Sequence, residues 1–267
     1  MSLRHVVAVD LLRPNSAPDG GDGASPDYLF DVVVTQSSSG GGGLVAVSTS
    51  GHEIKVYGQH SGGSGLALRQ RLVGHTAQIQ DLVLDASDPA LLWSCGSDGY
   101  ASVWDLRTGK AAMTFSSATV GGDMDPMLSV SVNAARSLVA VGCALNTDVT
   151  EARIKFWDVR NSGAGLAQFN ESHSNDITRV RFHPTVPNHL VSASEDGLVG
   201  FYALTDNFDE EESLESVLQS EQNVSRVGFF GQQNEYIYCT TNVETVEIWH
   251  PMQVFFSLIN SINKKNK

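Results

Sequence analysis

Residues 74–106 read GHTAQIQDLVLDASDPALLWSCGSDGYASVWDL, and residues 172–204 read SHSNDITRVRFHPTVPNHLVSASEDGLVGFYAL. The two stretches align without a gap over 33 residues, at a constant offset of 98 residues. Four polar or aromatic side chains recur at matching places: His75, Ser94, Asp98 and Trp104 in the first copy, and His173, Ser192, Asp196 and Tyr202 in the second. Such a repeat indicates a fold built from copies of one supersecondary unit.

An aromatic residue before a turn marks each copy and recurs 45 to 53 residues apart along the chain. The five aromatic positions are Tyr57, Trp104, Trp157, Tyr202 and Trp249. Between them lie short runs rich in Val, Ile, Leu and Phe, such as Ile79–Leu84 and Leu138–Val141, which are typical of β-strands. A Gly-His opening and a Trp-Asp close at this period are typical of a four-stranded propeller blade. The sequence therefore predicts an all-β propeller with about five recognisable blades.

Composition divides the chain into three parts. Residues 1–43 are predicted to hold one or more N-terminal strands and flexible loops rich in Gly, Ser and Pro. Residues 44–250 hold the blades, and residues 251–267 form a divergent C-terminal tail. The acidic stretch Asp206–Glu215 is predicted to be a solvated loop between two blades, with a docking site for a basic partner as the alternative.

The recurring polar residues predict a buried hydrogen-bond chain in each strong blade. A carboxylate can accept from imidazole, imidazole can bond a hydroxyl, and the hydroxyl can accept from an indole N–H. His, Ser and Asp also make a catalytic triad, but a triad occurs once in a cleft, whereas this set occurs in both copies. We therefore expect a structural role and no enzyme activity. The spacing of His, Cys and Asp predicts no metal site, and nothing in the sequence calls for a cofactor.

The chain carries a net charge of -13, which disfavours binding to nucleic acid or to an anionic membrane surface. Its three cysteines, Cys95, Cys143 and Cys239, are far apart and form no metal-binding or redox motif. We expect them to be reduced, buried thiols. Together with an N-terminus that does not resemble a signal peptide, they predict an intracellular location, with cytoplasm and nucleus both open.

Several segments resemble WD-repeat proteins. They include ESHSNDITRVRFHP, which begins at Glu171, SASEDGLV at residues 192–199, and ARIKFWDVR, which ends at Arg160. The resemblance implies a non-enzymatic scaffold that binds other proteins through loops on a rigid propeller. Propellers of this family have about seven blades, so the resemblance also implies that this chain is truncated at its C-terminus, with a non-functional product as an alternative.

A second alternative comes from two short motifs of the pattern WDxR. They read WDLR, ending at Arg107, and WDVR, ending at Arg160. The pattern resembles the contact that substrate receptors of cullin-RING ubiquitin ligases make with their propeller-shaped adaptor. The resemblance implies that Arg107 and Arg160 would bind carboxylates or carbonyls of such an adaptor. An arginine after Trp-Asp is also a common solvated turn residue, so both interpretations stay open.

Overall fold

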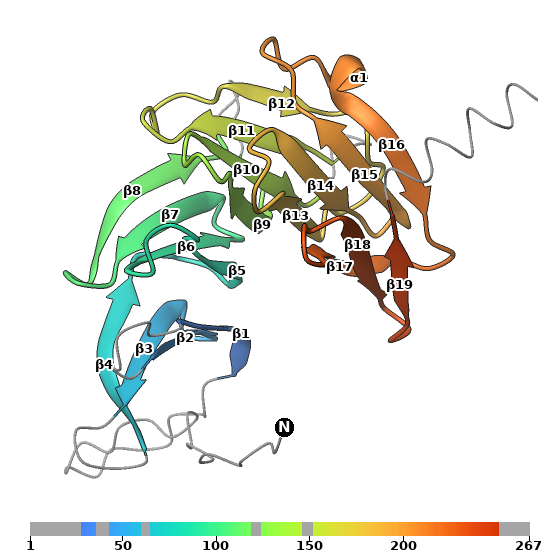
Figure 1. Ribbon diagram of the computed structural model, residues 1–267. Coiled ribbons are helices and arrows are strands. Elements are labelled where there is room, and N and C mark those ends of the chain that lie inside the picture. The colour runs from blue at the N-terminus through green and yellow to red at the C-terminus, as the bar shows by residue number, and fades with distance from the viewer. Residues whose placement is uncertain (1–27, 36–42, 60–64, 119–123, 146–151, 251–267) are drawn as a thin grey trace, which may run out of the picture.

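The computed structural model describes residues 28–35, 43–59, 65–118, 124–145 and 152–250. These residues form five antiparallel β-sheets (Figure 1). The all-β prediction is confirmed, because the described helical structure is a single turn, α1 (Glu210–Ser213). Within the described ranges, no helix is long and apolar enough to cross a membrane. The predicted tail, residues 251–267, lies outside the described residues.

Each sheet takes consecutive strands of the chain. The first sheet contains β1 (Leu29–Val34), β2 (Leu44–Thr49), β3 (Glu53–Gln59) and β4 (Leu66–Val73). The second contains β5 (Ile79–Leu84), β6 (Leu91–Gly96), β7 (Tyr100–Asp105) and β8 (Lys110–Ser116). The third contains β9 (Met127–Val132), β10 (Leu138–Cys143), β11 (Ile154–Asp158) and β12 (Ala167–Phe169). The fourth contains β13 (Arg179–Phe182), β14 (His189–Ala193), β15 (Leu198–Ala203) and β16 (Leu214–Gln219). The fifth contains β17 (Val224–Phe230), β18 (Tyr236–Thr241) and β19 (Val246–Trp249).

The five sheets follow one another around an arc, with the first and the fifth at its two ends (Figure 1). The first strand of each sheet lies on the inner side of the arc, and consecutive first strands contact one another from β1 to β17. The fourth strands β4, β8, β12 and β16 lie on the outer side. This is the arrangement of propeller blades around a central axis. The predicted blades therefore correspond to the five described sheets.

Apolar side chains fill the space between neighbouring sheets. Because successive residues of a strand point to opposite faces, one strand can serve two interfaces. On β6, Leu92 packs in the cluster between the first and second sheets, and Trp93 packs in the cluster between the second and third. Similar clusters join the third sheet to the fourth and the fourth to the fifth. The strands of the inner sheets are therefore apolar on both faces, which explains their nearly continuous hydrophobic runs.

The five marker aromatics all lie on the third strand of their sheets, from Tyr57 on β3 to Trp249 on β19. The turn that precedes the third strand is also shared by the two strong blades. In this turn Gly99 follows Asp98 and Gly197 follows Asp196, and the two glycines have φ values of 73° and 82°. This left-handed conformation suits glycine, because a Cβ atom would be strained there. The Asp-Gly pair of each repeat therefore shapes the turn.

The acidic stretch Asp206–Glu215 follows β15 and runs through α1 into the start of β16, inside the fourth sheet, so the prediction that it separates two blades is wrong. The sequence repeat ends at the third strand, whereas the sheet continues into a fourth strand that has no motif of its own. Within the stretch, the Glu210 carboxylate accepts hydrogen bonds from the backbone N–H groups of Asn170 and Glu171, at 2.7 and 3.0 Å. This part of the stretch is thus attached to the loop that leads into the fourth sheet.

Candidate functional site

The polar residues of the second blade form a continuous hydrogen-bond chain. His75 precedes β5, Ser94 lies on β6, and Trp104 lies on β7. Asp98 Oδ2 lies 2.9 Å from His75 Nδ1, and His75 Nε2 lies 2.8 Å from Ser94 Oγ. Trp104 Nε1–H donates to the same hydroxyl at 2.8 Å. Because a carboxylate only accepts, His75 donates from Nδ1, and in the neutral imidazole this leaves Nε2 as the acceptor for the Ser94 hydroxyl.

The fourth blade repeats this chain with a phenol in place of the indole. His173 lies 3.1 Å from Asp196 Oδ2 through Nδ1 and 2.6 Å from Ser192 Oγ through Nε2. The Tyr202 hydroxyl lies 3.2 Å from Ser192 Oγ. Burial raises the pKa of Tyr202 to about 12, so the phenol stays neutral and can donate to Ser192. One geometry is therefore filled by two different aromatic donors.

Each aspartate also fixes the backbone around its histidine. Asp98 accepts from the N–H of Thr76 at 2.9 Å, and Asp196 accepts from the N–H of Ser174 at 3.0 Å. Burial raises the pKa of each carboxyl group. The hydrogen bonds from the histidine and the backbone outweigh this effect and hold the pKa below its usual range. Both aspartates are therefore charged acceptors at neutral pH.

The surroundings of the two hydrogen-bond chains fit a structural role better than a catalytic one. Ser94 and Ser192 are both 0% exposed, so a substrate could not reach either hydroxyl in this conformation. Each hydroxyl is also occupied on two sides, by a histidine and by an aromatic donor. Among the described residues, no three His, Cys, Asp or Glu side chains gather in a way that could hold a metal ion.

Arg107 and Arg160 lie in the turns after the third strands of the second and third sheets, β7 and β11. Their side chains are 60% and 82% exposed. Each guanidinium folds back on the aspartate two residues earlier: Arg160 donates to Asp158 from Nε at 3.0 Å and from Nη2 at 2.8 Å. Arg107 donates to Asp105 from the same two nitrogens, at 2.9 and 3.3 Å. The two arginines thus occupy equivalent turns of neighbouring blades.

The fork leaves part of each guanidinium open. Arg160 Nη1 has no hydrogen-bond partner among the described residues, and Arg160 borders a hollow of 230 Å³ between the third and fourth sheets. The hydrogen bonds from Arg160 lower the pKa of Asp158 to about 2, so this pair stays charged over the physiological range. The turn therefore presents a fixed cation with free N–H donors to the solvent.

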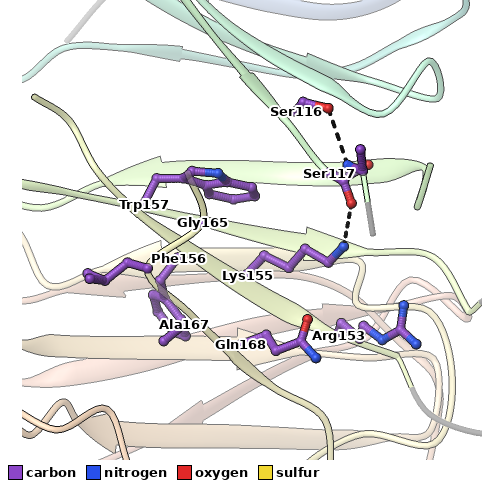
Figure 2. A pocket seen from close by; sticks show the side chains of 11 residues that line it. Ser116, Ser117, Arg153, Lys155, Phe156, Trp157, Gly165, Ala167 and Gln168 are labelled. Atoms are coloured by element: carbon purple, nitrogen blue, oxygen red, sulfur yellow. Dashed lines mark hydrogen bonds between the residues drawn. The ribbon is translucent and has the colours of Figure 1, made fainter. Parts of the chain in front are cut away.

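A larger cavity of 520 Å³ lies between the second and third sheets, where Trp157 and Lys155 line one wall (Figure 2). Lys155 and Arg153 both pair with Asp125, at 2.6 and 2.9 Å between nitrogen and Oδ2. Lys155 also donates to the backbone oxygen of Ser117 at 2.6 Å, as Figure 2 shows. The two cationic side chains of this cavity are therefore already paired within the protein, which makes the cavity a weak candidate for binding an anion.

Sequence reasoning missed one further polar cluster, at the inner side of the arc. Asp81 on β5 is 0% exposed and accepts from Arg179 and Arg181 of β13. It also accepts from Ser129 Oγ on β9 at 2.8 Å. Burial raises the pKa of Asp81, but the two arginines outweigh this and lower it. A signal was present in the sequence, because Asp81 and Arg179 have opposite charges and are separated by the repeat offset of 98 residues.

Comparison with known families agrees with this architecture. Residues 66–105 and 166–202 each match the WD40 family, described as WD domain, G-beta repeat. This chain carries WD40 repeats. Each match begins at the outer strand of one sheet, β4 or β12, and continues through the first three strands of the next, so the two matches contain both complete hydrogen-bond chains.

The WD40 chain is similar to longer relatives. It is 31% identical to WD repeat-containing protein GTS1 of Arabidopsis thaliana over 84% of this chain and 53% of that protein. It is 28% identical to the WD repeat-containing protein 89 homolog of Dictyostelium discoideum over 83% of this chain and 54% of that protein. A lower similarity, 26% over 59% of this chain and 15% of the other, relates it to GATOR2 complex protein Wdr59 of Drosophila melanogaster. The WD40 chain thus spans about half the length of the first two relatives.

Proposed function

We propose that this WD40 chain is a non-enzymatic scaffold that binds other proteins, and that Arg107 and Arg160 contact a partner. WD-repeat proteins generally serve as interaction scaffolds, and the name of the Wdr59 relative places that protein in a multiprotein complex. The observation that carries the proposal is the pair of exposed guanidinium forks on equivalent turns of neighbouring blades.

The geometry of these turns suits recognition of carboxylates or carbonyl oxygens. A guanidinium that is held by its own aspartate has lost most of its rotamer freedom before a partner arrives, so less entropy is lost on binding. Its remaining N–H groups point outward in a fixed plane, which favours charge-assisted hydrogen bonds. Rigid presentation on two adjacent blades would let one partner surface contact both turns.

The test is affinity purification of the tagged chain from cells, with quantification of the recovered proteins. We expect Arg107→Ala with Arg160→Ala to lower the recovery of at least one specific partner by about tenfold, a loss equal to one good charged contact. Arg71→Ala is the matched control, because Arg71 is also exposed and pairs with a carboxylate, Glu53, at 3.0 Å. Equal recovery of all partners by the double variant and the control would contradict the role of the two turns.

A second candidate function is that of a substrate receptor of a cullin-RING ubiquitin ligase. It is favoured by the WDxR pattern of both turns together with their exposure on neighbouring blades. In this case the lost partner would be the propeller-shaped adaptor of the ligase. Immunoblotting of the same purified samples for the adaptor separates this candidate from a general scaffold, since unchanged adaptor recovery would remove the ligase role only.

A further inference from the structure

A second cavity of 520 Å³ lies between the fourth and fifth sheets. It is lined by the turns that follow β13 and β17 and by residues of β14, β15 and β16. Because neighbouring strands run antiparallel, the turn after a first strand and the turn after a third strand lie at the same edge of each sheet. Two segments that line this cavity therefore lie at the edge that carries Arg107 and Arg160 in other blades.

Aromatic rings form the walls of this cavity and are held in place. The rings of His189 and Phe201 are 5.3 Å apart and cross at 73°, and those of His183 and Phe229 are 4.8 Å apart and cross at 65°. His183 accepts at Nδ1 from the N–H of Val186 at 3.0 Å and donates from Nε2 to the Asn234 oxygen at 3.2 Å. These contacts fix the neutral tautomer that carries its proton on Nε2. Burial also favours the neutral form, because it lowers the pKa of His183. The wall is therefore rigid and aromatic.

The charged groups that line the cavity are all acidic. They are Glu215 on β16 and Glu235 in the turn before β18, and the lining contains no Lys or Arg. Glu235 is positioned by the N–H of Gln233, which donates to it at 2.9 Å. The charged side chains of the two large cavities thus have opposite signs. The cavity in Figure 2 is lined by Arg153 and Lys155, which are paired within the protein. This cavity is lined by carboxylates that have no arginine or lysine partner among the lining residues.

One polar atom at this cavity is unsatisfied. Ser216 Oγ is buried and has no hydrogen-bond partner within the part of the chain that the structure describes. A buried hydroxyl without a partner costs free energy, so such atoms are uncommon in folded proteins. A donor from a bound ligand would satisfy it. The cavity therefore combines aromatic walls, negative charge and a free hydroxyl.

We propose that this cavity binds the arginine side chain of a partner protein. A guanidinium is planar and weakly hydrated, so it can lie against the faces of Phe201 or Phe229 as a cation–π contact. Its N–H groups can donate to the carboxylates of Glu215 and Glu235 and to Ser216 Oγ. The volume is in the range of about 300–1,000 Å³ that is usual for ligand pockets. The proposal rests on the scaffold function, but it uses a surface separate from Arg107 and Arg160.

The test uses a small probe and needs no identified partner. N-acetyl-arginine methylamide is titrated onto the purified 267-residue chain and followed by saturation-transfer difference NMR. N-acetyl-citrulline methylamide, which has nearly the same shape but no charge, is the control ligand. We expect the arginine probe to bind about tenfold more tightly than the citrulline probe, since only the cation gains from the rings and carboxylates.

Variants locate the probe. Glu215→Gln with Glu235→Gln should weaken arginine binding about tenfold. The control pair Glu195→Gln with Glu221→Gln removes the same charge from exposed positions and should leave binding unchanged. Ser216→Ala should weaken binding about threefold without lowering stability, because its hydroxyl has no partner in the folded chain. A purely structural role of Ser216 would not produce that split.

Equal binding of the two probes, no binding of either, or an equal loss in both glutamine pairs would overturn the proposal. None of these results would bear on the scaffold function, which is tested by partner recovery with the Arg107 and Arg160 variants. Partner recovery that persists while the arginine probe fails to bind would remove the cavity proposal and keep the scaffold.

Discussion

Asp81 on β5 and Arg179 on β13 occupy the same position in the two copies of the repeat, and their side chains form a buried ion pair. The pair joins the second and fourth sheets, and Ser129 of the third sheet bonds the same carboxylate. An unchanged copy would place two carboxylates at this point near the axis, where they would repel each other. Divergence of one repeat position to the opposite charge therefore links three blades.

The first prediction concerns this carboxylate. Asp81→Ala should lower the free energy of unfolding by about 3–5 kcal/mol, because it leaves Arg179 and the largely buried Arg181 without their shared counter-charge. Urea unfolding followed by Trp fluorescence measures the change. Glu195→Ala, at an exposed position, is the control and should stay within about 0.5 kcal/mol of the wild type. Equal stability of the two variants would show that the pair contributes nothing net.

The second prediction ranks two members of one hydrogen-bond chain. Ser192→Ala removes the hydroxyl that both His173 Nε2 and the Tyr202 phenol contact, and it should cost about 1–3 kcal/mol. Tyr202→Phe removes the 3.2 Å contact and leaves Ser192 bonded to His173, so it should cost about 0.5–1.5 kcal/mol. The same unfolding assay compares them. A larger loss for Tyr202→Phe would mean that ring packing, and not the chain of hydrogen bonds, dominates.

How much of this arrangement follows from the sequence differs between blades. The second and fourth blades could be predicted to the level of single contacts, because His, Ser, Asp and the aromatic residue interact within one sheet at fixed separations. Local spacing is therefore sufficient to place them. The third and fifth sheets could be predicted only from their aromatic residues, Trp157 and Trp249, and from short apolar runs.

Features that depend on packing between sheets could not be predicted in this way. The Asp81 cluster draws on three sheets, and the cavity beside Ser216 draws on two, so neither has a local sequence signature. The acidic stretch was misplaced for a related reason, since the fourth strand of a blade is defined by pairing with the third and has no motif of its own. That Arg107 and Arg160 lie in turns could be predicted from the ends of the strands before them. Their two-pronged hydrogen bonds to Asp105 and Asp158 could be seen only in the structure.

The third prediction concerns acid. The folded-state pKa values of Asp98 and Asp196 are lowered, so the stability that they contribute is complete above the unfolded-state pKa near about 3.9 and is lost as pH falls toward the folded-state value. Asp98→Asn with Asp196→Asn should therefore lower stability at pH 7 and flatten its decline between about pH 5 and pH 3. Urea midpoints across this pH range test it. An unchanged slope in the double variant would assign acid sensitivity to other carboxylates.

The fourth prediction concerns the three thiols, which are all buried and free of disulfides. Burial raises the pKa of Cys143 to about 12 and that of Cys239 to about 11, and it also raises the pKa of Cys95. Since the thiolate is the reactive form, the native chain should react negligibly with Ellman's reagent at pH 8, and all three thiols should react in urea.

As urea is raised, the order in which the three thiols become reactive should follow the positions of their sheets along the arc. Cys239 lies in the fifth sheet, which packs against one neighbouring sheet in the described part of the chain, whereas Cys95 and Cys143 lie in a cluster between the second and third sheets. An end sheet opens at lower free energy than an inner one, so Cys239 should react first at low urea. Cys239→Ser should remove only this early phase. Simultaneous reaction of all three thiols would show instead that the five sheets unfold as one cooperative unit.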